Sequence, residues 1–197
     1  MPESIDIFKI ESNHVLPTRG KILISEPFLC DKLFSRSVIL MIDHTCEGSM
    51  GLVMNKLSSL SLAEIFEDLD GKENIPIYWG GPLGTDTIFY IHTLTDIPHS
   101  LPLGKGLYMN GDFESVKEYI RQGKEIEGKI RFFVGYSGWE KGQLHEEIQM
   151  NTWIVSQTSN ASLMDEKESS DLWRTSLDRL GGKYKIWSRF PQRPSLN

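Results

Sequence analysis

The stretch Ser37-Val-Ile-Leu-Met-Ile-Asp43 decides the fold class of this 197-residue chain. Its centre, Val38–Ile42, is apolar throughout and rich in β-branched side chains. A strand with one face in water alternates apolar and polar residues, whereas a strand covered on both faces reads as a continuous apolar run. We therefore predict a central strand over 37–43 that is buried on both sides.

Outside this strand, short apolar runs alternate with turn residues, which predicts more strands and a few helices. A capping box formed by Ser61 and Glu64 predicts a helix over 61–69 that stops at Gly71. The other predicted helices cover 112–122, 137–150 and 170–180, with one helical turn over 31–36. The other predicted strands cover 21–26, 51–55, 75–79, 87–92, 107–110, 129–136 and 152–156.

The irregular order of these elements predicts an α+β (mixed α/β) fold. It favours a single compact domain with a mixed, largely antiparallel sheet and helices packed on its faces. We expect a lead-in segment over 1–19 with one short helix, a domain over 20–190 and a tail over 191–197. A small α/β subdomain, if present, would join at the loop predicted over 93–106. The polar stretch 157–170 is the best candidate for disorder or an insertion.

The charge balance argues against direct DNA binding. The chain carries 27 acidic and 21 basic residues, a net charge of −6, and duplex binding is driven by Lys and Arg that displace counterions from phosphates. The exception is a basic C-terminal segment, which we interpret as a solvated tail, with a docking patch for a nucleic acid or an acidic partner as the alternative. Its basic residues are Arg179, Lys183, Lys185, Arg189 and Arg193.

The sequence shows no pattern typical of a secretory signal or a membrane span, and its cysteines are few. These features predict a cytoplasmic protein. The longest apolar run, Val38–Ile42, is far shorter than the roughly 20 residues that cross a bilayer. Acidic residues close to Met1 are untypical of a secretory signal. Cys30 and Cys46 lack the spacing of a disulfide framework or a zinc site, so we predict a reducing compartment and no bound metal.

Two glycine-containing segments carry the strongest candidate chemistry. The first is the polar loop predicted over 44–50, followed by Asn55 and Lys56. Its glycines permit a close backbone approach to a ligand, although a bulged strand connection is the alternative. A further turn, Gly80–Pro82, could serve the same purpose or simply end a buried strand.

The second segment is Gly135-Tyr-Ser-Gly-Trp-Glu-Lys-Gly-Gln-Leu144. It follows a predicted strand, so Ser137 occupies the place of a nucleophile elbow, but the bulky Trp139 does not suit that motif. A capping box of Ser137 with Glu140 explains the same residues without catalysis. In the predicted helix, Glu140, Gln143 and Glu147 would form one polar stripe.

In their order and spacing, these segments resemble the YqgE/AlgH family of uncharacterised, mainly bacterial proteins. The resemblance implies a compact mixed α/β domain in the cytosol and no established activity, although some members are called transcriptional regulators. Leu57 and Ser137 depart from the family, which usually has proline and often alanine there, so the resemblance weakens Ser137 as a nucleophile. The resemblance covers about residues 20–190 and rests on Phe34–Val38, His44, Gly48–Lys56, Gly80–Pro82, His92, Gly135–Leu144, Glu147 and Trp153.

The sequence therefore favours a small-molecule or protein-binding module, with a regulatory role, over an enzyme; a hydrolase of small esters or phosphates is the alternative. We predict no cofactor and a monomer or small homo-oligomer. The hypothesis requires residues 44–56 and 136–147 to meet and line one exposed recess. Its candidate ligand-binding residues are His44, Gly48, Gly51, Asn55, Lys56, Tyr136, Trp139, Glu140, Gln143 and Glu147.

Overall fold

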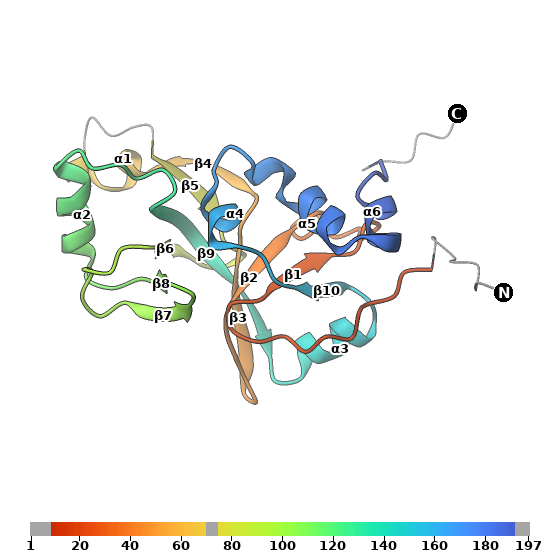
Figure 1. Ribbon diagram of the computed structural model, residues 1–197. Helices are drawn as coiled ribbons and strands as arrows, with labels where there is room; N and C mark the ends of the chain where they lie inside the picture. The colour runs from red at the N-terminus through yellow and green to blue at the C-terminus, as the bar shows by residue number, and fades with distance from the viewer. Residues whose placement is uncertain (1–8, 70–74, 192–197) are drawn as a thin grey trace.

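The long strand β9 (Ile130–Glu140) organises the molecule and runs through its middle (Figure 1). This computed structural model describes residues 9–69 and 75–191. β9 belongs to a ten-stranded sheet, in which β4 (Leu57–Ser61) and β5 (Pro76–Trp79) form a side branch. The remaining strands run in the order β10 (Trp153–Ser156), β1 (Ile22–Ser25), β2 (Val38–Thr45), β3 (Gly48–Val53), β9, β6 (Leu83–His92), β8 (Leu107–Met109) and β7 (Leu101–Gly104).

The sheet is mixed and largely antiparallel, as predicted. Among the described strands, β5 pairs with β9 in the parallel sense, and the other pairs are antiparallel. One continuous sheet joins both halves of the chain, so the fold is a single α+β domain.

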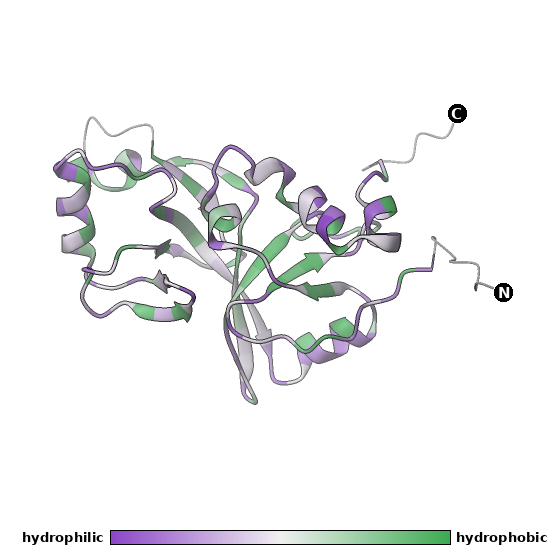
Figure 2. Ribbon diagram, in the orientation of Figure 1, coloured by the Kyte–Doolittle hydropathy of each residue, from purple (hydrophilic) through white to green (hydrophobic). Residues whose placement is uncertain are grey.

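The prediction of a central strand buried on both faces is confirmed for β2. Alternate side chains of β1 and β2 enter two different clusters, because successive strand residues point to opposite faces. Leu40 faces a cluster with Trp173 and Leu177 of α5 (Leu172–Leu180) and Trp187 of α6 (Gly182–Trp187). Ile39 faces Leu144 and Ile148 of α3 (Gln143–Gln149) on the other side. Figure 2 shows the apolar β1 and β2 between these helices.

A third cluster covers the β5–β6 half of the sheet. It contains Val116 and Ile120 of α2 (Phe113–Arg121), packed with Ile77 and Phe132 of β5 and β9. The helix predicted over 112–122 is present as α2, and Asp112 caps it by accepting a hydrogen bond of 2.9 Å from the Ser115 backbone nitrogen. The neighbouring α1 (Leu62–Ile65) and the 3-10 turn η1 (Glu67–Leu69) complete this cluster.

The helix predicted over 137–150 is wrong for the residues before Gln143. Residues up to Glu140 continue β9, and α3 begins only at Gln143. The backbone of 137–140 pairs with β3. The groups that a capping box would have used have other partners, since the Ser137 hydroxyl donates to the Gly80 carbonyl and the Glu140 backbone donates to the Gln143 side chain. The predicted stripe of Glu140, Gln143 and Glu147 along one helix is therefore also wrong.

Several other helix and strand boundaries differ from the prediction, because pairing with a neighbouring strand extends a strand beyond its own sequence pattern. The loop predicted over 44–50 is a hairpin, with β2 reaching Thr45 and β3 starting at Gly48. β4 was not predicted, and the helix expected over 61–69 divides after Ile65. Its capping box is present, since the Glu64 carboxylate accepts a 2.6 Å bond from the Ser61 backbone. Its predicted stop, Gly71, lies outside the described residues.

Two segments predicted to be irregular contain regular structure. The 93–106 segment holds β7, and the 157–170 segment holds α4 (Asn160–Met164) and the 3-10 turn η2 (Ser169–Asp171). The described part of the lead-in, from residue 9 on, contains no helix. Within residues 9–69 and 75–191, none of the helices has both the length and the apolar character needed to cross a membrane.

Candidate functional site

The two predicted motif segments do meet, through the pairing of β3 with β9. Ser49 lies opposite Trp139, and Gly51 lies opposite Ser137. A Cβ atom at Gly51 would come within 2.5 Å of the Ile39 side chain, so this glycine is required by the close approach of β2 and β3. The glycine that suggested a ligand contact therefore serves strand packing.

Glu147 of α3 is hydrogen-bonded to several of the motif residues. Its carboxylate accepts hydrogen bonds from the indole nitrogens of Trp139 (2.8 Å) and Trp153 (2.6 Å). It also accepts a 3.0 Å bond from the Gln143 amide, while the Gln143 carbonyl oxygen accepts from the Glu140 backbone at 2.9 Å. These four bonds hold α3 against β9 and β10, so we define these five residues as the brace.

Asn55 and Lys56 are tied to the segment before β2. The Asn55 side chain accepts a 2.9 Å bond from the Val38 backbone and donates one of 2.8 Å to the Arg36 carbonyl. The Lys56 ammonium donates to the Leu33 carbonyl, and burial lowers its pKa from the usual lysine value. Both side chains therefore stabilise a loop.

The remaining motif residues also have partners within the protein. The His44 ring nitrogen Nδ1 lies 2.7 Å from the Ser49 hydroxyl on the exposed hairpin, and Tyr136 packs edge-on against Phe89. Ser137 is buried, and its hydroxyl donates to the Gly80 carbonyl at 3.1 Å. An external ester or phosphate has no access to a hydroxyl in that position.

The motif region is thus a structural junction whose polar groups bind one another. Its two segments come together, whereas the exposed recess that they were expected to line stays a prediction. That the candidate residues also bind a ligand stays a prediction for His44, Gly48, Gly51, Asn55, Lys56, Tyr136, Trp139, Glu140, Gln143 and Glu147.

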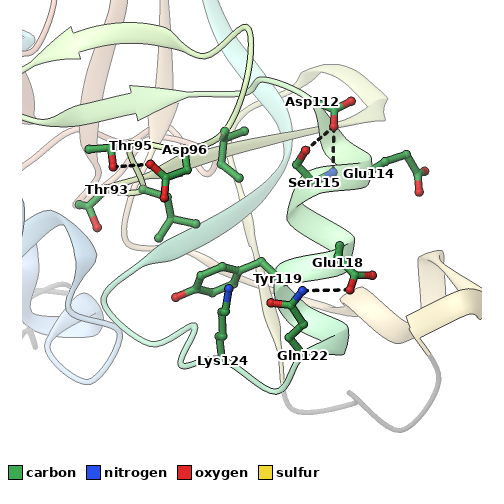
Figure 3. A pocket seen from close by; sticks show the side chains of 12 residues that line it. Thr93, Thr95, Asp96, Asp112, Glu114, Ser115, Glu118, Tyr119, Gln122 and Lys124 are labelled. Atoms are coloured by element: carbon green, nitrogen blue, oxygen red, sulfur yellow. Dashed lines mark hydrogen bonds between the residues drawn. The ribbon is translucent and has the colours of Figure 1, made fainter.

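A pocket of about 580 Å³ lies in another part of the molecule, between residues 93–97 and one face of α2 (Figure 3). None of the predicted ligand-binding residues lines it. Its walls combine apolar side chains of Leu94, Ile97 and Tyr119 with many oxygen atoms. We call it the α2 pocket. Its charged lining residues are Asp96, Asp112, Glu114, Glu118 and Lys124.

A buried histidine positions the first wall of the α2 pocket. His92 is fully buried, with Nδ1 3.1 Å from the Leu94 carbonyl oxygen and Nε2 2.9 Å from the Asn110 carbonyl oxygen. The Ser100 hydroxyl lies 3.1 Å from the same Nε2. Burial lowers the pKa of His92, and the two carbonyl oxygens oppose that effect.

The second wall is the polar face of α2 and the turn after it. The Tyr119 hydroxyl donates to the Glu125 carbonyl at 3.0 Å, and the Lys124 ammonium lies 5.1 Å from the centre of the Tyr119 ring. Gln122 donates a 3.0 Å bond to Glu118. The lining carries four carboxylates and one ammonium, and Lys117 and Arg121 outside the lining pair with Glu114 and Glu118. The remaining excess of carboxylates favours a cation.

Sequence reasoning missed the α2 pocket because its residues form no motif. The usable signals were the amphipathic pattern of 113–121 and the two aspartates that precede it, Asp96 and Asp112. Neither signal predicts that α2 and residues 93–97 face each other across a pocket. Among the described residues, no three His, Cys, Asp or Glu side chains are grouped closely enough to hold a metal ion.

The fold and this pocket define a small single-domain α+β protein built on one mixed sheet, with a polar pocket beside its smaller helical layer. The chain belongs to the AlgH-like family, whose model matches residues 22–185. This agrees with the resemblance drawn from the sequence motifs.

Relatives of known sequence match nearly the whole chain. A UPF0301 protein of Bacteroides fragilis is 59% identical over 98% of this chain and 97% of its own length. A UPF0301 protein of Parabacteroides distasonis is 45% identical, with 98% of each chain covered.

Two solved structures share the fold. The AlgH protein of Pseudomonas aeruginosa is 32% identical, with a TM-score of 0.69 over 90% of this chain and 97% of that one. A protein of Corynebacterium diphtheriae gives a TM-score of 0.74 at 23% identity, covering 89% and 94% of the two chains.

Proposed function

We propose that the protein is a binding module with a regulatory role, which takes a small cationic organic molecule in the α2 pocket. The observation that carries the proposal is a pocket of about 580 Å³, the size range of small-molecule sites, whose lining combines carboxylates with apolar side chains. An amine or guanidine group on a short carbon chain fits this combination of charges and apolar surface.

The state of the individual carboxylates supports a cationic ligand. Asp112 is engaged in capping α2, and Glu114 pairs with Lys117 at 2.5 Å. Asp96 receives a 2.9 Å bond from the Thr95 hydroxyl at one oxygen. Glu118 receives the Gln122 amide at one oxygen, and its other oxygen lies 3.9 Å from the exposed Arg121 guanidinium, an ion pair that a ligand cation would replace. Asp96 and Glu118 lie on opposite walls and are the residues we assign to the ligand cation (Figure 3).

We place this activity in the cytoplasm and away from direct DNA contact. Cys30 and Cys46 are exposed free thiols, which suits a reducing compartment. The net charge of −6 opposes the phosphate contacts that drive duplex binding. The hydrolase alternative gains no support, since the Ser137 hydroxyl is buried.

The test is the dissociation constant of a panel of primary amines and guanidines, measured by calorimetry on the full chain. We expect at least one compound to bind, and the variants Asp96→Asn and Glu118→Gln to weaken it roughly 10-fold each, the loss typical of one charge-assisted hydrogen bond. The matched control is Glu146→Gln on the exposed face of α3, which should leave the constant unchanged. Equal weakening by all three variants would show a nonspecific charge effect and contradict the proposal.

A further inference from the structure

A second pocket, of about 220 Å³, forms where three distant chain segments meet. One wall is the turn 18–21 before β1, the second is the β7–β8 connection over 103–107, and the third is 157–163 at the start of α4. We call it the β7–β8 pocket. It shares no residue with the α2 pocket or with the brace.

The charge of this pocket is opposite to that of the chain. Arg19, Lys21 and Lys105 line it, and its lining contains no acidic residue. Arg179 adds a fourth cation beside it, because its guanidinium donates a 3.0 Å bond to the hydroxyl of the lining residue Thr158. In a protein of net charge −6 such a gathering of cations is a local feature that favours an anionic ligand.

The cations of the pocket are only partly neutralised. Arg19 pairs with Asp43 at 2.7 Å, but its planar guanidinium has further donors. The Lys21 ammonium donates to the Leu16 carbonyl at 2.8 Å, which holds the side chain without cancelling its charge. Within the described part of the chain, no carboxylate lies at ion-pair distance from Lys21 or Lys105.

The walls are fixed by backbone hydrogen bonds. The Gly20 nitrogen donates to the Met41 carbonyl at 2.8 Å, and the Met41 nitrogen donates to the Lys21 carbonyl at 2.9 Å. Opposite them, the side-chain amide of Asn160 donates to the Lys105 backbone carbonyl at 2.7 Å. The cationic side chains therefore project from positions set before a ligand arrives, which lowers the entropy cost of binding.

We propose that the β7–β8 pocket binds a phosphate group. An arginine with two neighbouring ammonium groups matches the several oxygen acceptors of a dianionic phosphate. A volume of about 220 Å³ holds that group with a small part of its carrier, and it is below the usual range for whole drug-sized ligands. The source is free phosphate or the terminal phosphate of a small phosphomonoester.

The test is a titration of the full chain with inorganic phosphate and with glycerol 3-phosphate at constant ionic strength, followed by backbone NMR. We expect saturable shifts at residues 18–21, 103–107 and 157–160. Arg19→Gln and Lys105→Gln should each weaken binding roughly 10-fold, as expected for a lost charge-assisted contact. Asp43→Asn should tighten it severalfold, because Arg19 is then released from its ion pair.

The control is Lys141→Gln, an exposed cation paired with Glu47 far along the hairpin. It should leave the affinity unchanged. Tighter binding of glycerol 3-phosphate identifies a phosphomonoester as the ligand, and equal affinity identifies free phosphate. The proposal is overturned if neither anion produces saturable shifts, or if Lys141→Gln weakens binding as much as Arg19→Gln does.

Discussion

Glu147 shows how one residue can look like a ligand contact in sequence and serve the fold in three dimensions. Its carboxylate is the shared acceptor of two buried indole donors, those of Trp139 and Trp153. A buried donor without an acceptor loses the hydrogen bond that it had with water in the unfolded chain. The type and spacing of these residues were visible in the sequence, but their mutual contact was not.

Replacing this acceptor gives the first stability prediction. Glu147→Ala leaves both indole donors unpaired, so we expect the free energy of unfolding to fall by about 2–6 kcal/mol, given about 1–3 kcal/mol for each buried group. Urea unfolding followed by tryptophan fluorescence measures this change. The neighbouring exposed variant Glu146→Ala should change it by less than about 0.5 kcal/mol. Equal stability of the two variants would mean that the brace contributes nothing.

His92 gives a prediction about pH. A neutral imidazole donates one hydrogen bond, yet both ring nitrogens of His92 face carbonyl oxygens. Because burial is the larger effect, the pKa in the folded state is lowered from the ordinary histidine value. The unfolded chain then binds more protons near pH 6, so the stability that neutral His92 contributes is present above about pH 6.5 and is lost as the pH falls.

The test compares the wild type with His92→Gln, whose side chain does not titrate. Unfolding free energies at pH 7.5 and pH 5.5 should show the variant less stable at the higher pH, with a gap that narrows at the lower pH. A gap that widens on acidification would mean that the two carbonyl oxygens outweigh burial and raise the pKa.

At the scale of elements, β9 is where sequence reasoning was least complete. The pattern of Ser137 and Glu140 fits a helix cap, and only the pairing with β3 shows that these residues are in a strand. A local sequence pattern predicts hydrogen bonds between residues that are close in the chain. The pairing of β9 with β3, in contrast, depends on a partner strand more than 80 residues earlier in the chain. The continuous run of β2 needed no such partner to be recognised, so its burial was predicted correctly.

The β2–β3 contact gives a prediction at this scale. A methyl group at position 51 would overlap the Ile39 side chain at 2.5 Å and the Leu40 carbonyl oxygen at 3.0 Å. We expect Gly51→Ala to lower the free energy of unfolding by about 1–3 kcal/mol, the usual cost of overpacking a tight interior. Thermal and urea unfolding measure it, with the exposed Lys141→Ala as the control. An unchanged stability would show that the two strands separate without cost.

At the scale of the whole molecule, the fold class, the single domain and the meeting of the two motif segments were all accessible from sequence. The α2 pocket was not, because it depends on how the 93–97 loop and α2 face each other across a third hydrophobic cluster. The β7–β8 pocket likewise collects cations from positions 19, 21 and 105, whose proximity no motif records. Packing of distant segments, rather than residue type, creates both pockets.

The central claim is that ligand recognition occurs in the α2 pocket while the motif residues hold the fold together. The most direct measurement is a backbone NMR map of the full chain during titration with the tightest-binding amine. We predict saturable chemical-shift changes that are confined to the backbone of residues 93–97 and 112–124. Shifts centred on residues 44–56 and 136–147 would contradict this account and return the binding site to the motif segments.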